Sequence, residues 1–472
     1  MRRAISAAVV VGLVLGGAAA MPAFAAAGGQ GVAPAGVAAL KTVLYDGYEL
    51  KVPANWPVYR LTANSTTCVR YDIQAVYLGT PSANMNCPAG LAGRAQTVSV
   101  IPSTTVAAGL GSQVTYQREQ PDGAGGTKLG TLAAVNGVVT ENATAHELRV
   151  VLDAAQPATV VATYDASPAV VEQVLASLRV VSRGSRATPQ TGTPQTGTPQ
   201  TGTPQTGTPA AGPAPSSLSA SGRSLAARGP VQIVQSPPQK RSPGHPVLGF
   251  DTCTAPSLKT MGVWRQRYAA VGIYIGGVNY ACAFGNLSAS WIQAAASMGW
   301  GMLPTYVGPQ APCWGYQGVT INPKNAVADG RAAGADAVRD AMLFGLPRGS
   351  PIYYDMEAYN TTHWRICVPA VLTFLGAWDR TVAAAGYVTG VYSSQDSGIA
   401  DMQRAVVDKR RGFTPPDAIW FALWDNIRAL SDGVLHWPFT RRNKQYAGNA
   451  NVTIGKIRLD IDRDLVFGPL AR

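Results

Sequence analysis

The chain has 472 residues, enough for two or three domains, and 46% of them are hydrophobic, as in an ordinary globular protein. Its formal net charge is +12, but no basic cluster is interleaved with aromatic residues, so nucleic-acid binding is not expected. The positive charge favours anionic partners such as wall polymers or membrane surfaces, or it serves solubility alone.

Residues 1–25 have the pattern of a signal peptide. Arg2 and Arg3 precede an apolar stretch from Ile5 to Ala20, and Ala23–Ala25 fits a small-x-small cleavage site. The paired arginines raise the twin-arginine route, but the apolar residues that usually follow directly are missing, so we favour the general secretory route. No other stretch is long and apolar enough to span a bilayer. We expect a secreted, extracellular protein, free or associated with the cell wall, without stable membrane insertion after processing.

Residues 40–183 are predicted to form a small α+β domain with a mostly antiparallel sheet. Its strands are marked by β-branched and apolar runs, and residues 168–178 have the apolar spacing of a helix. The predicted strands are 43–45, 48–52, 97–100, 147–152 and 159–164. Asp72 beside Arg70 is interpreted as a structural pair, because no catalytic constellation surrounds it. The role of this domain is not indicated by its sequence.

Residues 184–245 are predicted to be a disordered linker. The repeat Thr-Pro-Gln-Thr-Gly begins at Thr188 and runs four times to Gly207, followed by a degenerate copy. A proline in every fifth position blocks helices and central strands, and the glycines loosen the chain. Such a run cannot form a packed core, so it acts as a spacer.

Residues 246–472 alternate strands with helices, which predicts a parallel sheet and an α/β fold. About eight strands in roughly 225 residues favour a closed TIM-like (β/α) barrel over an open sheet. The last units leave little room for helices, so the barrel should be irregular at its end. The predicted strands are 247–251, 272–277, 302–307, 352–357, 387–392, 418–424, 444–446 and 457–461.

Carboxylates stand at the ends of several of these strands. The acids are Asp251, Asp355, Glu357, Asp425, Asp460, Asp462 and Asp464. In such barrels the active site lies at the carboxyl ends of the strands, and alternation places Asp355 and Glu357 on one face. Two adjacent carboxyl groups raise the pKa of one of them, as a glycosidase acid requires. A single strand-end acid is usually solvated, but acids from several strands at one mouth indicate a function.

Aromatic residues lie at or just past the same strand ends. They are Tyr274, Tyr306, Trp314, Tyr316, Tyr359, Tyr392 and Trp424. Flat rings stack on sugar faces, so we expect substrate-binding residues among them, in particular Tyr306, Tyr359, Tyr392 and Trp424. The alternative is that about half of these rings pack the barrel or cover its ends.

The six cysteines are expected to form disulfides, because the chain has an export signal and no Cys-x-x-Cys. We pair Cys68 with Cys87, Cys253 with Cys282, and Cys313 with Cys367, although the last four allow three pairings. The four histidines are scattered, so neither a metal site nor a cofactor is expected.

The segment from Leu248 to the C-terminus resembles the glycoside hydrolase-like domain-of-unknown-function family of exported actinobacterial proteins, which is similar to the family 25 lysozymes. The matching pieces are Gly249–Asp251, Tyr353–Glu357, Trp420–Trp424, Gln445-Tyr446 and Asp460–Asp462. The resemblance implies an irregular (β/α) barrel, a peptidoglycan-type substrate and cleavage with retained configuration.

The same resemblance implies roles for individual residues. Glu357 would be the general acid, and Asp355 would orient or stabilise the acetamido group of the substrate. Asp251 and Asp462 would tune this dyad and hold the sugar, and Gln445 would bind substrate. The chain departs from those lysozymes in its four barrel cysteines, in an extra loop at 310–322, and in Asp464, where they prefer Asn.

We therefore expect a secreted, monomeric glycoside hydrolase of the lysozyme type that acts on a cell-wall polysaccharide. The alternative is a non-catalytic carbohydrate-binding or wall-remodelling protein that uses the same cleft. The intact pair of Asp355 and Glu357 favours catalysis, because a binding protein has no reason to keep it.

Overall fold

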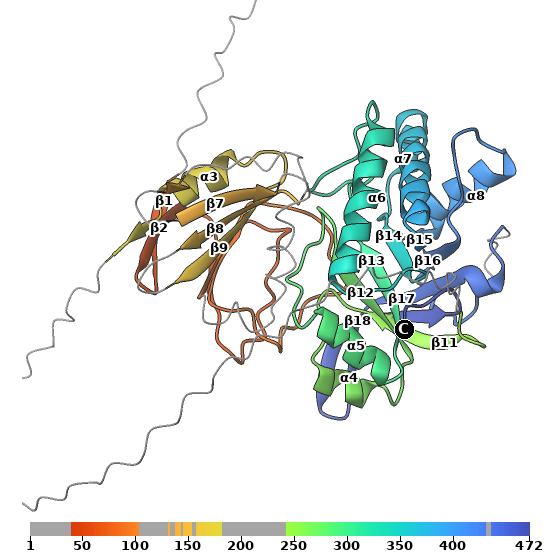
Figure 1. Ribbon diagram of the computed structural model, residues 1–472, viewed down its shortest axis with the longest axis horizontal. Coiled ribbons are helices and arrows are strands. Elements are labelled where there is room, and N and C mark those ends of the chain that lie inside the picture. The colour runs from red at the N-terminus through yellow and green to blue at the C-terminus, as the bar shows by residue number, and fades with distance from the viewer. Residues whose placement is uncertain are drawn as a thin grey trace, which may run out of the picture.

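The computed structural model describes residues 39–102, 131–132, 137–142, 145–152, 157–181, 242–430 and 436–472. The predicted signal peptide and nearly all of the predicted linker lie outside these residues. The described chain forms a small sheet-based unit beside a barrel, and strands and helices of the barrel alternate in sequence (Figure 1). The predicted α/β class, with a TIM-like barrel after a small α+β domain, is confirmed.

In its described residues the N-terminal unit contains two sheets and one helix, α3 (Ala169–Ala176). Strands β1 (Leu40–Tyr45), β2 (Tyr48–Pro53) and β10 (Arg179–Val180) form an antiparallel sheet of three. The larger sheet has the order β3-β4-β5-β9-β8-β7-β6. Its strands are β3 (Val58–Arg60), β4 (Ala75–Leu78), β5 (Thr97–Pro102), β6 (Thr131–Leu132), β7 (Gly137–Asn142), β8 (Glu147–Leu152) and β9 (Ala158–Thr163). Strands β3 to β5 run parallel and the other pairs are antiparallel, so the sheet is mostly antiparallel, as predicted.

Eight strands close the barrel in sequence order, from β11 to β18. They are β11 (Val247–Asp251), β12 (Ala270–Gly276), β13 (Gly301–Tyr306), β14 (Pro351–Asp355), β15 (Val388–Ser394), β16 (Ala418–Ala422), β17 (Arg442–Ile454) and β18 (Ile457–Val466). Neighbouring strands are parallel except for β18, which is antiparallel to both β17 and β11. The expected irregularity at the end of the barrel is therefore a hairpin without a helix.

Within residues 242–430 and 436–472, five α-helices lie around the barrel: α4 (Leu258–Trp264), α5 (Ala289–Ser297), α6 (Ala326–Leu343), α7 (Trp364–Ala384) and α8 (Ala400–Val407). Ser257 and Ser288 cap α4 and α5, because their side chains accept hydrogen bonds from the backbone N–H groups of Thr260 and Trp291. Helices α6 and α7 lie side by side (Figure 1). Among the described residues one segment, Arg365–Ala384 of α7, has the length and hydropathy of a membrane span, but 67% of it is buried, as in a core helix.

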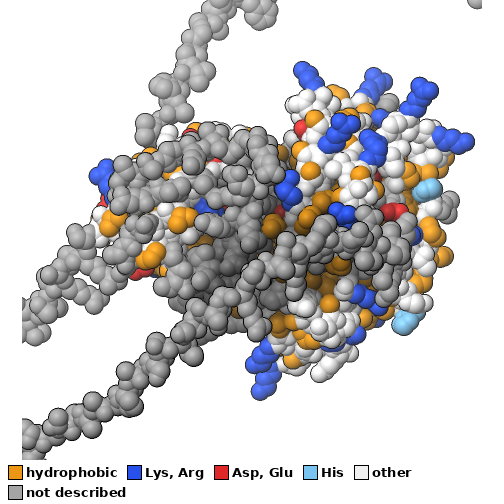
Figure 2. All heavy atoms as spheres, in the orientation of Figure 1, with side chains coloured by type: hydrophobic (Ala, Val, Ile, Leu, Met, Phe, Trp, Pro, Cys, Tyr) orange, Lys and Arg blue, Asp and Glu red, His pale blue; other side chains and the backbone are white. Residues whose placement is uncertain are grey.

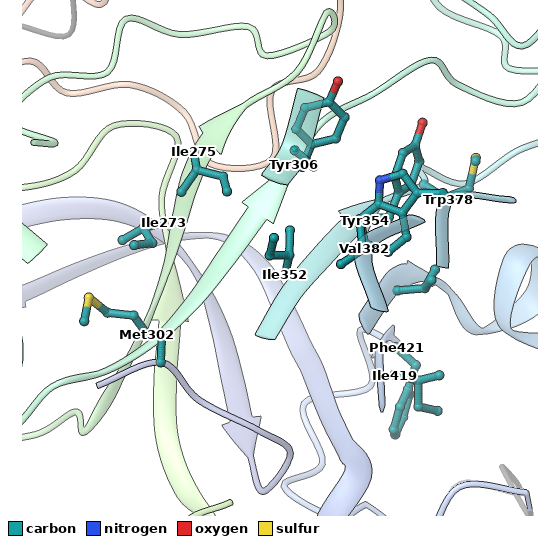
Figure 3. Close-up of a cluster of buried hydrophobic side chains, with 14 of the residues drawn as sticks. Ile273, Ile275, Met302, Tyr306, Ile352, Tyr354, Trp378, Val382, Ile419 and Phe421 are labelled. Carbon is teal, nitrogen blue, oxygen red and sulfur yellow. The ribbon is translucent and has the colours of Figure 1, made fainter. Parts of the chain in front are cut away.

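Strand alternation divides the barrel residues between two environments. Ile273, Ile352 and Tyr354 point outward and pack with Trp378 and Val382 of α7 or with neighbouring strands (Figure 3). Tyr353, Tyr392 and Trp420 belong to a separate buried cluster inside the barrel. Burial of this outer apolar layer fixes each strand's rotation and so decides which side chains point toward the barrel axis.

Lys and Arg side chains project at separate points over the outer helices, and no single basic patch is visible on the face in Figure 2. This distribution fits the formal charge of +12 being spread along the chain. This face therefore shows no concentrated positive surface that would attract an anionic polymer.

Candidate active site

Five carboxyl side chains meet inside the mouth of the barrel. Asp251 ends β11, Asp355 ends β14, and Glu357 follows two residues later. Asp462 and Asp464 lie on β18, where Asp462 is the register partner of Asp251. The four aspartates are buried and Glu357 is half-buried. The structure thus brings together the four predicted acids, and it adds Asp464, which the sequence argument placed near the last strand without a role.

Asp355 and Glu357 form the central pair. Burial, the largest cause, raises the pKa of Glu357 to about 7, while a hydrogen bond with Asp355 lowers it and the charge of Asp251 raises it. Burial and then the charge of Glu357 hold the pKa of Asp355 well above its usual range. Within the described residues Asp355 Oδ1 has no donor, as expected for a carboxyl oxygen facing another carboxyl group. The protonation of each carboxyl group therefore depends on that of the other.

Gln310 fixes the backbone on both sides of this pair. Its Nε2 donates to the carbonyl oxygen of Asp355 at 2.8 Å, and its Oε1 accepts from the backbone N–H of Glu357 at 2.8 Å. The side chain is fully buried. Gln310 opens the loop 310–322, whose Cys313 is bonded to Cys367 of α7. The sequence indicated Gln310 only as the first residue of that loop. Its hydrogen-bond partners lie more than 40 positions away in sequence, so no local pattern could identify its role.

Gln445 connects the acids to the aromatic side of the mouth. Its Nε2 donates to Oδ2 of Asp251 at 3.0 Å and to Oδ2 of Asp462 at 3.2 Å. Its Oε1 accepts from the hydroxyl of Tyr392 at 2.9 Å and from Nε1 of Trp424 at 2.8 Å. All four polar positions of the amide are used, so its orientation is fixed. The predicted residues Tyr392, Trp424 and Gln445 thus lie beside the acids.

The pKa values of the remaining acids are also raised. Burial, the largest cause, raises the pKa of Asp251 to about 6, against the lowering effect of hydrogen bonds from Gln445 and Tyr274. Burial and the charge of Asp251 raise the pKa of Asp462 to about 9. Burial likewise raises the pKa of Asp464 well above its usual range, and its Oδ1 accepts from Nε1 of Trp420 at 3.0 Å.

Two predicted substrate-binding tyrosines lie elsewhere. The hydroxyl of Tyr306 donates to Asp336 of α6 at 2.8 Å, and Tyr306 packs in the outer apolar layer (Figure 3). The hydroxyl of Tyr359 donates to Asp401 of α8 at 2.7 Å. The prediction that both rings bind substrate is therefore wrong. The side chain of Tyr306 points outward from β13, and Tyr359 lies in the segment that leads from β14 to the helices. Tyr274 points inward instead, and its hydroxyl donates to Asp251 at 3.2 Å.

Other predicted residues have structural roles. Asp425 forms an ion pair with the buried Lys444, Nζ to Oδ2 at 2.8 Å, and is not part of the acid cluster. The three disulfides pair as predicted: Cys68–Cys87, Cys253–Cys282 and Cys313–Cys367. Within the described ranges, Cys68, Cys87 and Cys282 are the only group with metal-ligand spacing, and their sulfur atoms are already bonded in disulfides.

The arrangement can donate and accept protons at neutral pH beside an aromatic surface. Trp424 is 53% exposed and packs against Gly448, where an added Cβ would stand 2.1 Å from the ring. The half-buried Glu357 is the member of the central pair that reaches the open side of the mouth. A proton donor with a pKa of about 7 is suited to acid-assisted cleavage of a glycosidic bond.

Residues 263–466 match the model of the family described as Rv2525c-like, glycoside hydrolase-like domain. The matched stretch contains Asp355, Glu357 and Asp462, and this match confirms the resemblance predicted from the motifs. A comparison with curated proteins finds no match.

Several solved structures are similar to this chain. An uncharacterized protein of B. stearothermophilus has 19% identity and a TM-score of 0.34, and the match covers 47% of this chain and 95% of that one. The catalytic domain of endolysin ply40, from bacteriophage P40 of Listeria monocytogenes, has 12% identity and a TM-score of 0.31, over 48% and 94%. A family 25 glycosyl hydrolase from Bacillus anthracis has 14% identity and a TM-score of 0.30, over 47% and 89%.

Proposed function

We propose that this chain, whose residues 263–466 carry a glycoside hydrolase-like domain of the Rv2525c-like family, is a secreted hydrolase of cell-wall polysaccharide. The substrate class that we favour is peptidoglycan or a related polymer that contains N-acetylated sugars. The sequence motifs shared with the family 25 lysozymes support this choice, and the three disulfides fit an exported protein.

The observation that carries the proposal is the difference between Asp355 and Glu357. Both carboxyl groups have a raised pKa, but Asp355 is buried at the strand end whereas Glu357 is half-buried at the opening of the barrel. Only Glu357 combines access to a substrate with a pKa of about 7. Glu357 is therefore the general acid, and it donates its proton to the oxygen of the glycosidic bond.

Asp355 assists in this proposed reaction. As the bond to the leaving sugar breaks, the acetamido oxygen of the substrate bonds to the anomeric carbon, and Asp355 accepts a hydrogen bond from the acetamido N–H. Water then attacks the same carbon as its bond to the acetamido oxygen breaks, a proton of the water passes to Glu357, and the configuration is retained because two displacements have occurred at that carbon. Gln310 and Gln445 hold the participating side chains in place. The ring of Trp424 provides a flat surface for a neighbouring sugar.

The test is digestion of purified cell walls by the full chain, with release of reducing ends as the readout. The wild type should release soluble fragments, and Glu357→Gln should abolish this release while the thermal unfolding transition is unchanged. Asp408→Asn is a matched control, because Asp408 is an exposed acid on the same barrel. Equal release by Glu357→Gln and the wild type would contradict the assignment of the acid.

The same experiment separates catalysis from binding. Saturable sedimentation with walls, with no new reducing ends from the wild type, would support a non-catalytic wall-binding protein instead. For the hydrolase, activity should fall as pH rises above about 7, because Glu357 then loses the proton that it must donate. Activity that increases steadily above this pH would argue against Glu357 as the donor.

A further inference from the structure

A loop of the N-terminal unit reaches the mouth of the barrel. This wall loop, residues 88–93, follows Cys87 and precedes the buried Arg94. Gly90 is exposed, yet a Cβ added to it would stand 3.2 Å from Oδ2 of Asp462. A residue that is open to solvent and also adjacent to a buried acid of the site lies at the edge of the cleft. The loop therefore borders the same space as the acids.

The wall loop is held to the barrel by hydrogen bonds at its C-terminal end. The backbone N–H of Gly93 donates to the carbonyl oxygen of Asn279 at 2.9 Å. Nη1 of Arg94 donates to the carbonyl oxygen of Tyr280 at 3.1 Å, and Nη2 donates to the carbonyl oxygen of Ala145 at 2.6 Å. The guanidinium of Arg94 thus ties the N-terminal unit and the barrel together directly behind the loop.

A shared apolar core stands behind these contacts. Val69, Tyr77 and Cys87 of the N-terminal unit pack with Tyr274 and Tyr280 of the barrel. The backbone N–H of Tyr71 donates to the carbonyl oxygen of Ala281 at 2.7 Å, and that of Ala283 donates to Val69 at 3.2 Å. Tyr274 also donates to Asp251, so one ring belongs to both the site and the junction between the units. The position of the wall loop is therefore coupled to the site by packing.

The chemistry of the loop differs from the rest of the mouth. Its side chains, in Pro88, Ala89, Leu91 and Ala92, carry neither charge nor hydroxyl, whereas the side-chain atom nearest to the Cβ position of Gly90 is a carboxyl oxygen of Asp462. Gly90 has a φ of 61° and no side chain, so a ligand can approach its backbone closely. An uncharged surface facing acids suits a ligand with an apolar substituent on one side and hydrogen-bonding groups on the other.

We propose that the catalytic cleft is composite and that the wall loop of the N-terminal unit forms one side of it. This wall selects N-acetylated sugars, because the methyl of an acetamido group packs on the loop while its N–H faces the acids. The inference rests on the proposed function for its substrate class, and it assigns to the N-terminal unit a direct part in substrate selection.

The test is binding of a soluble β-1,4-linked oligomer of N-acetylglucosamine to the full chain. Glu357→Gln serves as the background so that no turnover occurs, and calorimetry measures Kd. Adding Gly90→Trp fills the space next to Asp462 and should weaken binding by about tenfold or more. Gly90→Asn is a second variant, because asparagine tolerates a positive φ better than most residues. Gly47→Asn is the matched control: Gly47 has a φ of 83° in a turn of the same unit.

The outcomes separate the two proposals. Weaker binding with both Gly90 variants, with binding by Gly47→Asn unchanged, supports the composite cleft. If all variants bind the oligomer with equal affinity, the wall loop does not form part of the cleft, and the hydrolase assignment is unaffected. Equal affinity of the background protein for the oligomer and for its de-N-acetylated form overturns the proposed selectivity. Absence of binding to either oligomer overturns the inference, whereas the proposed hydrolase is judged separately by release of reducing ends from walls.

Discussion

Replacing Asp251 by Asn should change how the stability of the protein depends on pH. The pKa of Asp251 rises from its ordinary value of 3.8 to about 6, chiefly through burial. The folded state therefore binds this proton more tightly than the unfolded state does. Its contribution to stability is fully present below pH 4 and is lost as the pH rises through 6. At about 1.4 kcal/mol per pKa unit, the loss amounts to about 3 kcal/mol.

Asp251→Asn removes this titration, and its single oxygen keeps one of the two hydrogen bonds that Asp251 accepts, from Tyr274 on Oδ1 and from Gln445 on Oδ2. The difference in unfolding free energy between variant and wild type should thus move by about 3 kcal/mol in favour of the variant between pH 4 and pH 7. Urea unfolding followed by tryptophan fluorescence measures this, because every tryptophan except Trp56 lies in residues 246–472. The exposed-acid variant Asp408→Asn should show no such change. An equal difference at both pH values would refute the reasoning.

Three further predictions follow from the contacts of the site. Gln310→Leu should lower kcat by about a hundredfold with little change in KM, because it removes the hydrogen bonds that hold the backbone around Asp355 and Glu357. An effect on KM alone would contradict a positioning role for Gln310. Trp424→Ala should weaken oligosaccharide binding about tenfold without lowering the unfolding temperature, since the ring is 53% exposed, whereas Phe439→Ala, at 51% exposure, should not affect binding. Replacing both Cys313 and Cys367 by Ser should reduce the unfolding free energy by about 4 kcal/mol, given their separation of 54 residues; unchanged denaturant midpoints would argue otherwise.

The barrel could be predicted because its signals are local. Strand and helix periods alternate through residues 246–472, and closure of the sheet then brings acids from distant strand ends together. The prediction from this topology that acids meet at the mouth holds for Asp251, Asp355, Glu357 and Asp462, but not for Asp425, which pairs with Lys444. The strands β3, β4, β6, β7 and β10 of the N-terminal unit were not predicted, and all of these except β7 have only two to four residues, which carry little periodic signal.

The finer parts of the site depend on contacts that the sequence does not encode locally. Tyr306 ends its strand as Asp355 does, but side-chain direction alternates, and the phase at a strand end follows from packing against the helices. Gln310 and Gly90 lie in irregular segments, and their importance arises from partners in other strands. The strand ends therefore revealed which acids meet, whereas the groups that orient and enclose them required the folded chain.

Asp464 provides a test of why the mouth keeps so many acids. Its Oδ1 accepts from Trp420, and its Oδ2 has no hydrogen-bond partner among the described residues, while burial and then the charge of Asp251 raise the pKa of Asp464 well above its usual range. In Asp464→Asn, the amide oxygen can still accept from Trp420, and the amide nitrogen can donate to Asp251. The variant should therefore be more stable than the wild type at pH 7 by about 1–3 kcal/mol, as judged by urea unfolding. Lower stability would contradict this account of the pair. Buried acids that reduce stability are typical of functional sites, so a more stable Asp464→Asn that hydrolyses walls more slowly would place the proton of Asp464 in the reaction.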